Sequence, residues 1–383
     1  MKVLVSSFVM PAGPGVAKAG VGRHILATLD GIARTDLGHT YDVFLPASFP
    51  IPAEWCDSPW TTWHPVEIAN TRTRVIWEHA RVASEARRRG ADVLFATFPA
   101  VPVASRVPMV SVIHDAFPRT HPQWYSGRKR RVMDGLHAHT AKRCARIVTV
   151  SEWSRSEIAR AYKVPLEKIL VAPNGPGNEL TRLSPEALAR VDLNALIPDG
   201  TRYLMTLSTL EPRKNLAGLL EAFALLRGGH PGLKLLVVGA RGWKESPVFE
   251  TVTRLGIEDD VIFAGYVEDA LIGPLLQRAE LFVLPSFVEG FGIPVLEAMT
   301  VGAPVACSNT SSLPEVAGET AFSFSPDDPG AIARAIAAAL ADPETMRRRA
   351  EAGFARSSEF SWERSLRGIE RAWREAATIR AVS

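Results

Sequence analysis

Two glutamates, Glu289 and Glu297, stand on either side of Gly290 and Gly292. An ionised carboxylate accepts paired hydrogen bonds, and sugars and ribose both present vicinal hydroxyl pairs. The glycines let a ligand approach the backbone, and Pro294 favours a helix start just after them, where amides attract an anion. The spacing favours a nucleotide-sugar site, with Glu289 in a loop and Glu297 in the first helical turn. Taken alone, the two glutamates are equally consistent with purely structural roles, in which Glu289 is solvated and Glu297 complements the helix dipole.

Two cations, Arg213 and Lys214, follow a strand-like run at 203–207 and precede a helix-like run at 216–226. The dipole at a helix start disfavours cations, so a purely solvated role is the weaker interpretation. Two positive side chains in such a loop can neutralise a diphosphate leaving group. The pair is therefore a candidate phosphate clamp.

A histidine and a glycine-containing turn lie in the first half of the chain. His114 directly follows the apolar run 109–113, where it acts either as a structural hydrogen bonder or in a ligand site. The turn at 20–23 lies between a strand and a helix, as a phosphate loop does. Ile25 occupies the place of the third glycine of a dinucleotide fingerprint, so a nicotinamide-dependent dehydrogenase, suggested by the fold alone, is disfavoured.

Short apolar runs rich in β-branched residues alternate with helix-like segments along the chain. The predicted strands are 2–8, 41–45, 93–96, 109–113, 147–150, 169–172, 203–207, 234–238, 261–263, 281–284 and 304–308. The predicted helices are 22–34, 74–89, 129–144, 154–162, 216–226, 247–255, 271–278, 294–301, 329–340 and 362–377. Apolar strands separated by helices indicate parallel sheets covered on both faces. The predicted class is α/β, with doubly wound, Rossmann-like domains that leave an interdomain cleft at the carboxyl ends of their strands.

The length of 383 residues exceeds one ordinary core and predicts two domains. A segment rich in Pro, Gly and Asn at 173–201 separates them, which gives an N-terminal domain 1–178, a C-terminal domain 179–361 and a closing helix 362–383. The composition, 46% hydrophobic and 22% charged, excludes disordered and fibrous classes, and no apolar run is long enough to span a membrane. Three scattered cysteines fit a reducing compartment, so we expect a cytoplasmic protein.

Positive charge is concentrated in the first domain. Residues 1–178 hold 23 Lys and Arg against 14 Asp and Glu, although the net charge of the chain is only +3. The densest cluster is 128–131. It is either a solvated helix face or a surface for anionic lipid, the latter implying peripheral attachment to the inner face of the membrane. Nucleic acid is the weaker partner, because no helix-turn-helix, zinc or aromatic RNA-binding pattern accompanies the charge.

The stretch from residue 285 reads P-S-x-x-E-G-F-G-x-P-x-L-E-A-M-x-x-G-x-P-V. It resembles the donor site of retaining glycosyltransferases of family 4, the glycosyl transferases group 1, which have the two-domain GT-B fold. Further segments in the order of this family are 112–115, 148–154, 172–175, 209–215, 238–239, 265–267 and 360–362. The resemblance therefore covers most of the chain. The segments 209–215 and 239–243 are similar to members that transfer mannose from GDP-mannose.

The resemblance implies roles for the candidate residues. Glu289 contacts the transferred sugar and faces the positive charge developing at its anomeric carbon, and Glu297 holds the ribose. Arg213 and Lys214 clamp the diphosphate, and His114 approaches the reacting centre. The implied donor-binding residues are Gly290, Phe291, Gly292, Ile293, Thr209, Gly239, Tyr266 and Val267. The residues implied near the phosphate and the acceptor are Gly20, Val21, Gly22 and Arg23.

One position departs from the family. Many members carry an arginine where this chain has Thr209, so Arg213 is the candidate substitute. The resemblance also implies that the loop 265–267 packs on the base and that the last helix crosses back to the first domain.

The expected function is therefore the retaining transfer of a hexose from a nucleotide-diphosphate sugar to a glycan or lipid-linked acceptor in polysaccharide or glycolipid biosynthesis. Mannose from GDP-mannose is the first candidate, and a UDP-sugar is the alternative donor. A nucleotide-sugar epimerase has the same fold, whereas a non-catalytic binding module is disfavoured because both glutamates and both cations are present. The sequence has no D-x-D motif, so we expect no divalent metal and no cofactor.

Overall fold

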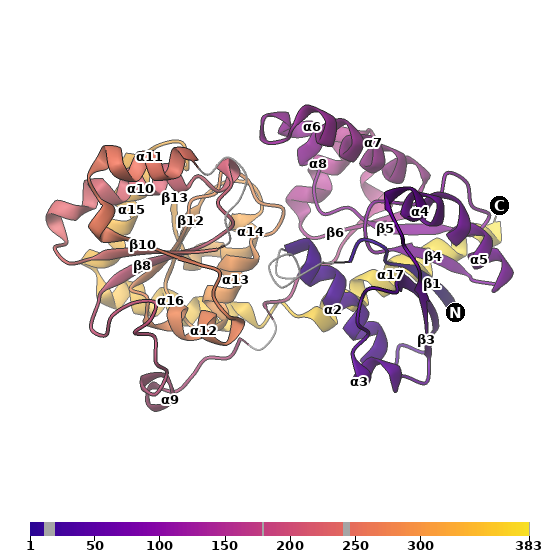
Figure 1. The fold of residues 1–383 in the computed structure, drawn as a ribbon, viewed down its shortest axis with the longest axis horizontal. Helices are drawn as coiled ribbons and strands as arrows, with labels where there is room; N and C mark the ends of the chain where they lie inside the picture. The colour runs from indigo at the N-terminus through magenta and orange to yellow at the C-terminus, as the bar shows by residue number, and fades with distance from the viewer. Residues whose placement is uncertain (11–19, 178–179, 240–245, 383) are drawn as a thin grey trace. The chain divides into compact units, whose positions relative to one another are not determined.

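The computed structural model describes residues 1–10, 20–177, 180–239 and 246–382, with the backbone alone for 246–247 and 380–382. These residues form two compact units, Met1–Asn174 with Ser361–Ser383, and Gly175–Phe360. Each unit contains a parallel β-sheet flanked by helices (Figure 1), so the predicted α/β class is confirmed. Within the described ranges, no helix is both long and apolar enough to cross a membrane.

The first unit is built on a parallel sheet with strand order β3-β2-β1-β4-β5-β6-β7. Its strands are β1 (Lys2–Ser6), β2 (Thr40–Pro46), β3 (Thr61–Val66), β4 (Val93–Ala96), β5 (Met109–Val112), β6 (Arg146–Thr149) and β7 (Ile169–Val171). Its helices are α2 (Gly20–Arg34), α3 (Ala53–Cys56), α4 (Thr71–Ile76), α5 (Val82–Arg88), α6 (Phe117–Thr120), α7 (Gly127–Arg143), α8 (Glu152–Tyr162) and α17 (Trp362–Val382). A π-helical turn, Trp77–Arg81, joins α4 to α5, so the predicted helix 74–89 is irregular at its centre.

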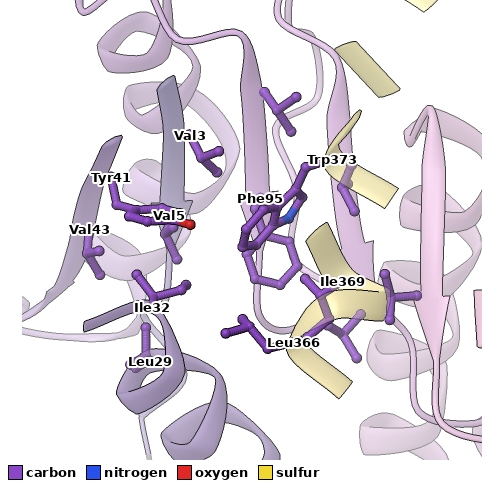
Figure 2. Packing of buried hydrophobic residues seen from close by; sticks show 14 of the residues in the cluster. Val3, Val5, Leu29, Ile32, Tyr41, Val43, Phe95, Leu366, Ile369 and Trp373 are labelled. Carbon is purple, nitrogen blue, oxygen red and sulfur yellow. The ribbon is translucent and has the colours of Figure 1, made fainter. Parts of the chain in front are cut away.

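The C-terminal helix α17 belongs to the core of the first unit, although the rest of that unit ends at residue 174. Figure 2 shows Trp373 of α17 beside Phe95 of β4, and the centroids of the two rings lie 5.2 Å apart. Leu366 packs against Gly31 of α2 so closely that an added Cβ there would lie 2.8 Å from the leucine side chain. The apolar face of α17 thus covers one face of the first sheet, and its burial stabilises the unit.

The second unit is built on a parallel sheet with strand order β10-β9-β8-β11-β12-β13. Its strands are β8 (Tyr203–Leu207), β9 (Lys234–Val238), β10 (Val261–Gly265), β11 (Leu281–Leu284), β12 (Val305–Ser308) and β13 (Phe322–Phe324). Its helices are α9 (Pro185–Ala189), α10 (Leu216–Leu226), α11 (Ser246–Leu255), α12 (Asp269–Arg278), α13 (Ile293–Thr300), α14 (Leu313–Ala317), α15 (Pro329–Ala341) and α16 (Pro343–Ser357). The strand order reverses between β8 and β11, and ligands of such sheets bind outside the carboxyl ends at this switch point.

Several elements were not expected from the sequence, and three of them show why. β3 is an edge strand that contains Pro65, and β13 is a three-residue edge strand. Edge strands are exposed on one side and tolerate proline, so they lack the continuous apolar pattern by which central strands are recognised. α16 is a charged helix with few buried residues, and it therefore has only a weak apolar stripe.

Candidate active site

Glu289 lies at the centre of a buried ion cluster in the second unit. Its Oε1 accepts hydrogen bonds from Nζ of Lys214 at 2.6 Å and Oγ of Ser286 at 2.7 Å. Its Oε2 accepts a hydrogen bond from Nη1 of Arg213 at 2.9 Å. The residue is only 6% exposed, so the two ion pairs act in a poorly solvated environment. A carboxylate has about four acceptor positions, so these three bonds leave room for about one more donor, such as a sugar hydroxyl.

The charges of this cluster are not balanced. Burial alone raises the pKa of the Glu289 carboxyl, but Lys214, Arg213 and the hydrogen bonds from Lys214 and Ser286 outweigh it and lower the pKa to about 2. Burial and then repulsion from Arg213 lower the pKa of the Lys214 ammonium, although Glu289 attracts it. The two cations thus explain the shift of Glu289, whereas burial is the larger cause of the shift of Lys214. Arg213, Lys214 and Glu289 together carry one positive charge in excess, and Glu211, which pairs with Nη2 of Arg213 at 3.6 Å, partly offsets it.

The contact between these residues depends on the order of strands. Arg213 and Lys214 lie in the loop after β8, and Glu289 lies in the loop after β11. These strands are neighbours in the sheet, so their carboxyl ends meet at the switch point. The backbone N–H of Phe287 also donates to the Arg213 carbonyl at 3.0 Å, and Arg213 Nη1 donates to the Val288 carbonyl at 3.0 Å. The loop after β8 and the loop after β11 are thus held together by hydrogen bonds.

Asn215 ends the turn that carries the two cations. Its backbone is left-handed, with φ of 54°, and it precedes the first residue of α10. Its Nδ2 donates to the Pro326 carbonyl at 2.7 Å, and its side chain lies so close to Gly218 that an added Cβ there would be 2.6 Å away. Asparagine tolerates this backbone conformation better than most residues, which explains its place here.

The predicted donor residues 290–293 lead into α13: residues 290–291 lie in the loop before it, Gly292 caps the helix and Ile293 is its first residue. Gly292 has φ of 106°, and a Cβ at this position would lie 2.5 Å from a methyl group of Leu313. Only glycine therefore fits without rearrangement. Phe291 and Ile293 are buried, and the ring of Phe291 lies edge-on to that of Phe360 at 5.8 Å.

Glu297 lies in the second turn of α13, because the helix begins at Ile293 and has no acidic residue in its first turn. The expectation of a first-turn position is therefore wrong, and so is the alternative that this glutamate complements the helix dipole, because that effect is confined to the first turn. Its side chain is 1% exposed. A role in holding ribose stays a prediction.

The remaining donor candidates gather at the same edge of the sheet. The N–H of Gly239 after β9 donates to the Gly265 carbonyl at 2.8 Å. Gly239 has φ of 148°, and a Cβ there would lie 2.0 Å from the carbonyl oxygen of Ser208, the residue before Thr209. Tyr266 and Val267 follow directly, the first 47% exposed and the second buried. The loops after β8, β9 and β10 are therefore in backbone contact.

His114 lies in the first unit, two residues after the end of β5, and packs against a residue that sequence reasoning missed. The rings of His114 and His24 meet edge to face at 4.8 Å. His24 is fully buried and its Nδ1 shares a 2.9 Å hydrogen bond with Oδ1 of Asn174. Burial, assisted by His24 and His137, holds the pKa of His114 well below its usual range, and burial lowers the pKa of His24 to about 4. Both imidazoles are therefore neutral near pH 7.

The expected phosphate loop is part of a helix. Gly20, Val21, Gly22 and Arg23 form the first turn of α2, whose first described residue is Gly20. The prediction of a loop at 20–23 is wrong in this respect, because glycine disfavours but does not exclude a first helical turn. The more informative residue of this segment is His24, which directly follows Arg23. Its ring packs against that of His114.

The geometry thus brings Arg213, Lys214 and Glu289 together in the second unit, and His24 and His114 together in the first. Two parallel α/β units, with a cation pair at the switch point of the second, are the architecture of GT-B glycosyltransferases, and the comparisons agree. Residues 193–356 match the model of glycosyl transferases group 1, and residues 19–176 match that of glycosyltransferase family 4. Over 259 residues the chain is 36% identical to O-antigen chain mannosyltransferase B of Escherichia coli, a match that covers 66% of this chain and 67% of that protein.

Solved structures show the same fold. Sucrose-phosphate synthase from Thermosynechococcus elongatus has a TM-score of 0.74 at 18% identity, with 100% of both chains covered. Anabaena Alr3699/HepE in complex with UDP-glucose has a TM-score of 0.72 at 20% identity, covering 97% of this chain and 98% of that chain. The chain belongs to glycosyltransferase family 4, the glycosyl transferases group 1.

Proposed function

We propose that this glycosyltransferase transfers a hexose with retention of configuration from a nucleoside-diphosphate sugar to a glycan or lipid-linked acceptor, in polysaccharide or glycolipid biosynthesis. The observation that carries the proposal is the buried contact of Glu289 with Arg213 and Lys214. One small molecule can touch both the carboxylate and the cations. The excess positive charge of the trio suits a diphosphate, and the remaining acceptor position suits a sugar hydroxyl.

The proposed mechanism is a front-face displacement. The bond from the anomeric carbon to the diphosphate oxygen breaks, the acceptor oxygen bonds to the same carbon from the same side, and the leaving phosphate takes the proton of the acceptor. Arg213 and Lys214 stabilise the charge on the leaving group. Glu289, with a pKa of about 2, is ionised at neutral pH, so it acts as an electrostatic partner of the oxocarbenium-like carbon rather than as an acid or base.

GDP-mannose is the proposed donor, because the relative with 36% identity is a mannosyltransferase. A thermal-shift panel of GDP-mannose, GDP-glucose, UDP-glucose and UDP-galactose tests this. We expect GDP-mannose to raise the midpoint of unfolding most, since only ligands that bind the folded state stabilise it. A larger shift with a UDP-sugar would reject mannose transfer from GDP-mannose. An epimer formed from the donor without any acceptor would favour an epimerase of the same fold.

We also propose that transfer needs no divalent ion, since two side-chain cations already face the diphosphate position. Initial rates in excess EDTA should equal those of the untreated enzyme within about twofold, as expected if Arg213 and Lys214 supply the whole electrostatic clamp. A strict dependence on added manganese or magnesium would contradict this.

A membrane surface is the proposed second partner of the first unit. The basic residues Arg128, Lys129 and Arg131 of α7 are exposed, and Val132 beside them is 57% exposed. His139, two turns further along this helix, contacts the carbonyl of Pro102 at 3.3 Å.

Val103, the residue after Pro102, is 63% exposed. Its N–H donates to the carbonyl of His79, and His79 follows the exposed Ile76 by three residues. Exposed apolar side chains near basic residues are typical of peripheral attachment to anionic lipid. The proposed location is the cytoplasmic face of the membrane.

Flotation with liposomes tests this attachment. We expect the protein to float with vesicles containing phosphatidylglycerol and not with neutral phosphatidylcholine vesicles, and to be released by salt. The variant R128E/K129E/R131E should lose flotation. The matched control R347E/R348E on α16 of the second unit, where both arginines are exposed, should keep it. Equal flotation of both variants would contradict this surface.

A further inference from the structure

Three consecutive hydroxyl residues support the loop that carries Glu289. Oγ1 of Thr310 donates to the Phe287 carbonyl at 3.0 Å. Oγ of Ser311 accepts from the Glu289 N–H at 2.9 Å. Oγ of Ser312 lies 2.9 Å from the Glu289 carbonyl and 2.9 Å from that of Phe291. The contacts fall on every second residue of the loop, so the turn 310–312 runs along it and restrains its backbone.

The bond at Ser311 has one possible direction, because the backbone N–H of Glu289 can only donate. Its Oγ also donates to the carbonyl of Thr310 at 2.7 Å. A hydroxyl has one hydrogen, so its lone pairs remain to accept from Glu289. Alanine or glycine cannot replace this acceptor.

The backbone of Ser311 is strained. Its φ is 56°, and among the described residues the other non-glycine residues with positive φ are Lys163 and Asn215. Serine is not among the residues that adopt this region readily, and such outliers cluster at functional sites. Ser311 contacts Glu289, and Asn215 directly follows Lys214. The loop that carries the two cations therefore ends at a left-handed residue, Asn215. The loop that carries Glu289 is hydrogen-bonded to another, Ser311.

We infer that Ser311 and Ser312 are positioning residues for transfer. They hold the backbone of Glu289 at the depth at which its carboxylate lies between the two cations. The strain at Ser311 is kept because a serine there supplies an acceptor that the unstrained glycine would lack. This inference rests on the proposed role of Glu289.

Two substitutions at Ser311 distinguish the effect of its hydroxyl from the effect of its backbone conformation. Ser311→Gly relieves the left-handed strain and removes the acceptor, whereas Ser311→Ala removes the acceptor and keeps the strain. We expect kcat to fall about 10- to 100-fold in both variants, as for small displacements of a catalytic group, with KM for donor and acceptor changed less than about threefold. We expect the glycine variant to unfold at a higher temperature than the alanine variant.

Lys163→Gly is the matched control, because Lys163 has φ of 53° at the end of α8 in the first unit. It should relieve strain and leave kcat unchanged. Full activity of Ser311→Gly with loss in Ser311→Ala would show that only backbone conformation matters and would overturn the inference. Full activity of both would overturn it as well.

Ser312→Ala provides a second test, since this residue is fully buried and has an ordinary backbone. The same fall in kcat at unchanged KM is expected, and normal kcat per folded molecule would overturn its positioning role. Glu289→Gln, measured in parallel, distinguishes a failure of the proposed function from a failure of this inference. If it retains activity, the proposed function fails. If it is inactive while the serine variants are normal, only this inference fails.

Discussion

Replacing Glu289 with glutamine is expected to lower kcat by about 10³-fold, the effect of losing a preorganised charge that stabilises the transition state. Glutamine keeps the shape and one acceptor oxygen but not the negative charge that faces the anomeric carbon. KM for the donor should change less than kcat, because the charge on that carbon develops only in the transition state. Steady-state kinetics with the preferred donor measure both constants. Turnover within tenfold of the wild type would reject the proposed role.

The same variant should be less stable. Glu289 is the shared counter-ion of two largely buried cations, and leaving a buried charge without its partner costs about 3 kcal/mol. Because the folded-state pKa of Glu289 is about 2, below its usual 4.5, its contribution to the free energy of unfolding is complete above pH 4.5 and is lost as the pH falls toward 2. Urea unfolding across this window should show a smaller pH dependence in Glu289→Gln than in the wild type.

Glu280→Gln is the control for both measurements. Glu280 pairs with Arg202 at 2.6 Å just before β11, at the opposite end of this strand from Glu289, and Arg202 is half-exposed. Exposed ion pairs contribute little, so we expect unchanged kcat and a change in unfolding free energy below about 1 kcal/mol. Equal losses of kcat in the two variants would point to a general effect of charge on the unit.

Replacing Lys214 with alanine is expected to weaken the binding of a free nucleoside diphosphate by about 10- to 100-fold, the loss of one charge-assisted hydrogen bond. The buried trio then changes from one excess positive charge to neutral, because Arg213 and Glu289 remain as a pair. Binding is weakened rather than abolished, since Arg213 still faces the phosphate position. Isothermal titration calorimetry with GDP and UDP measures the effect.

Lys234→Ala is the matched control for this experiment. Lys234 begins β9 and pairs with Asp260 at 2.8 Å, at the end of the sheet opposite to the cluster. Its loss should leave the affinity for the diphosphate unchanged. An unchanged affinity in Lys214→Ala would contradict the clamp, and an equal loss in the control would indicate long-range attraction by net charge instead.

Much of the fold follows from local patterns. The central strands, such as β8 and β9, have the bounds expected from their apolar runs, and α10 likewise begins and ends at the expected residues. These elements are buried on several sides, so their composition alone identifies them. The edge strands β3 and β13 were missed because half of their surface faces solvent and no apolar run marks them.

The candidate site was recognised only in parts. The glutamate–glycine motif and the basic loop carry signals in their own sequences, whereas His24 lies within an ordinary helical pattern and Ser311 within a polar turn. Their significance comes from the partners they touch, His114 and Glu289, which lie 90 and 22 residues away along the chain. Sequence spacing does not encode such contacts.

The amino-acid sequence by itself determined the α/β class, the family and the identity of the charged groups, because apolar periodicity and short motifs are local properties. Only the tertiary structure decided that Glu289 pairs with Lys214 and Arg213, and that a strained serine supports it. The reason is the strand order, which places β8 beside β11 although two strands separate them in the chain. Burial then makes the ion pairs strong and the pKa of Glu289 low, and burial is a property of the packed sheet and helices together.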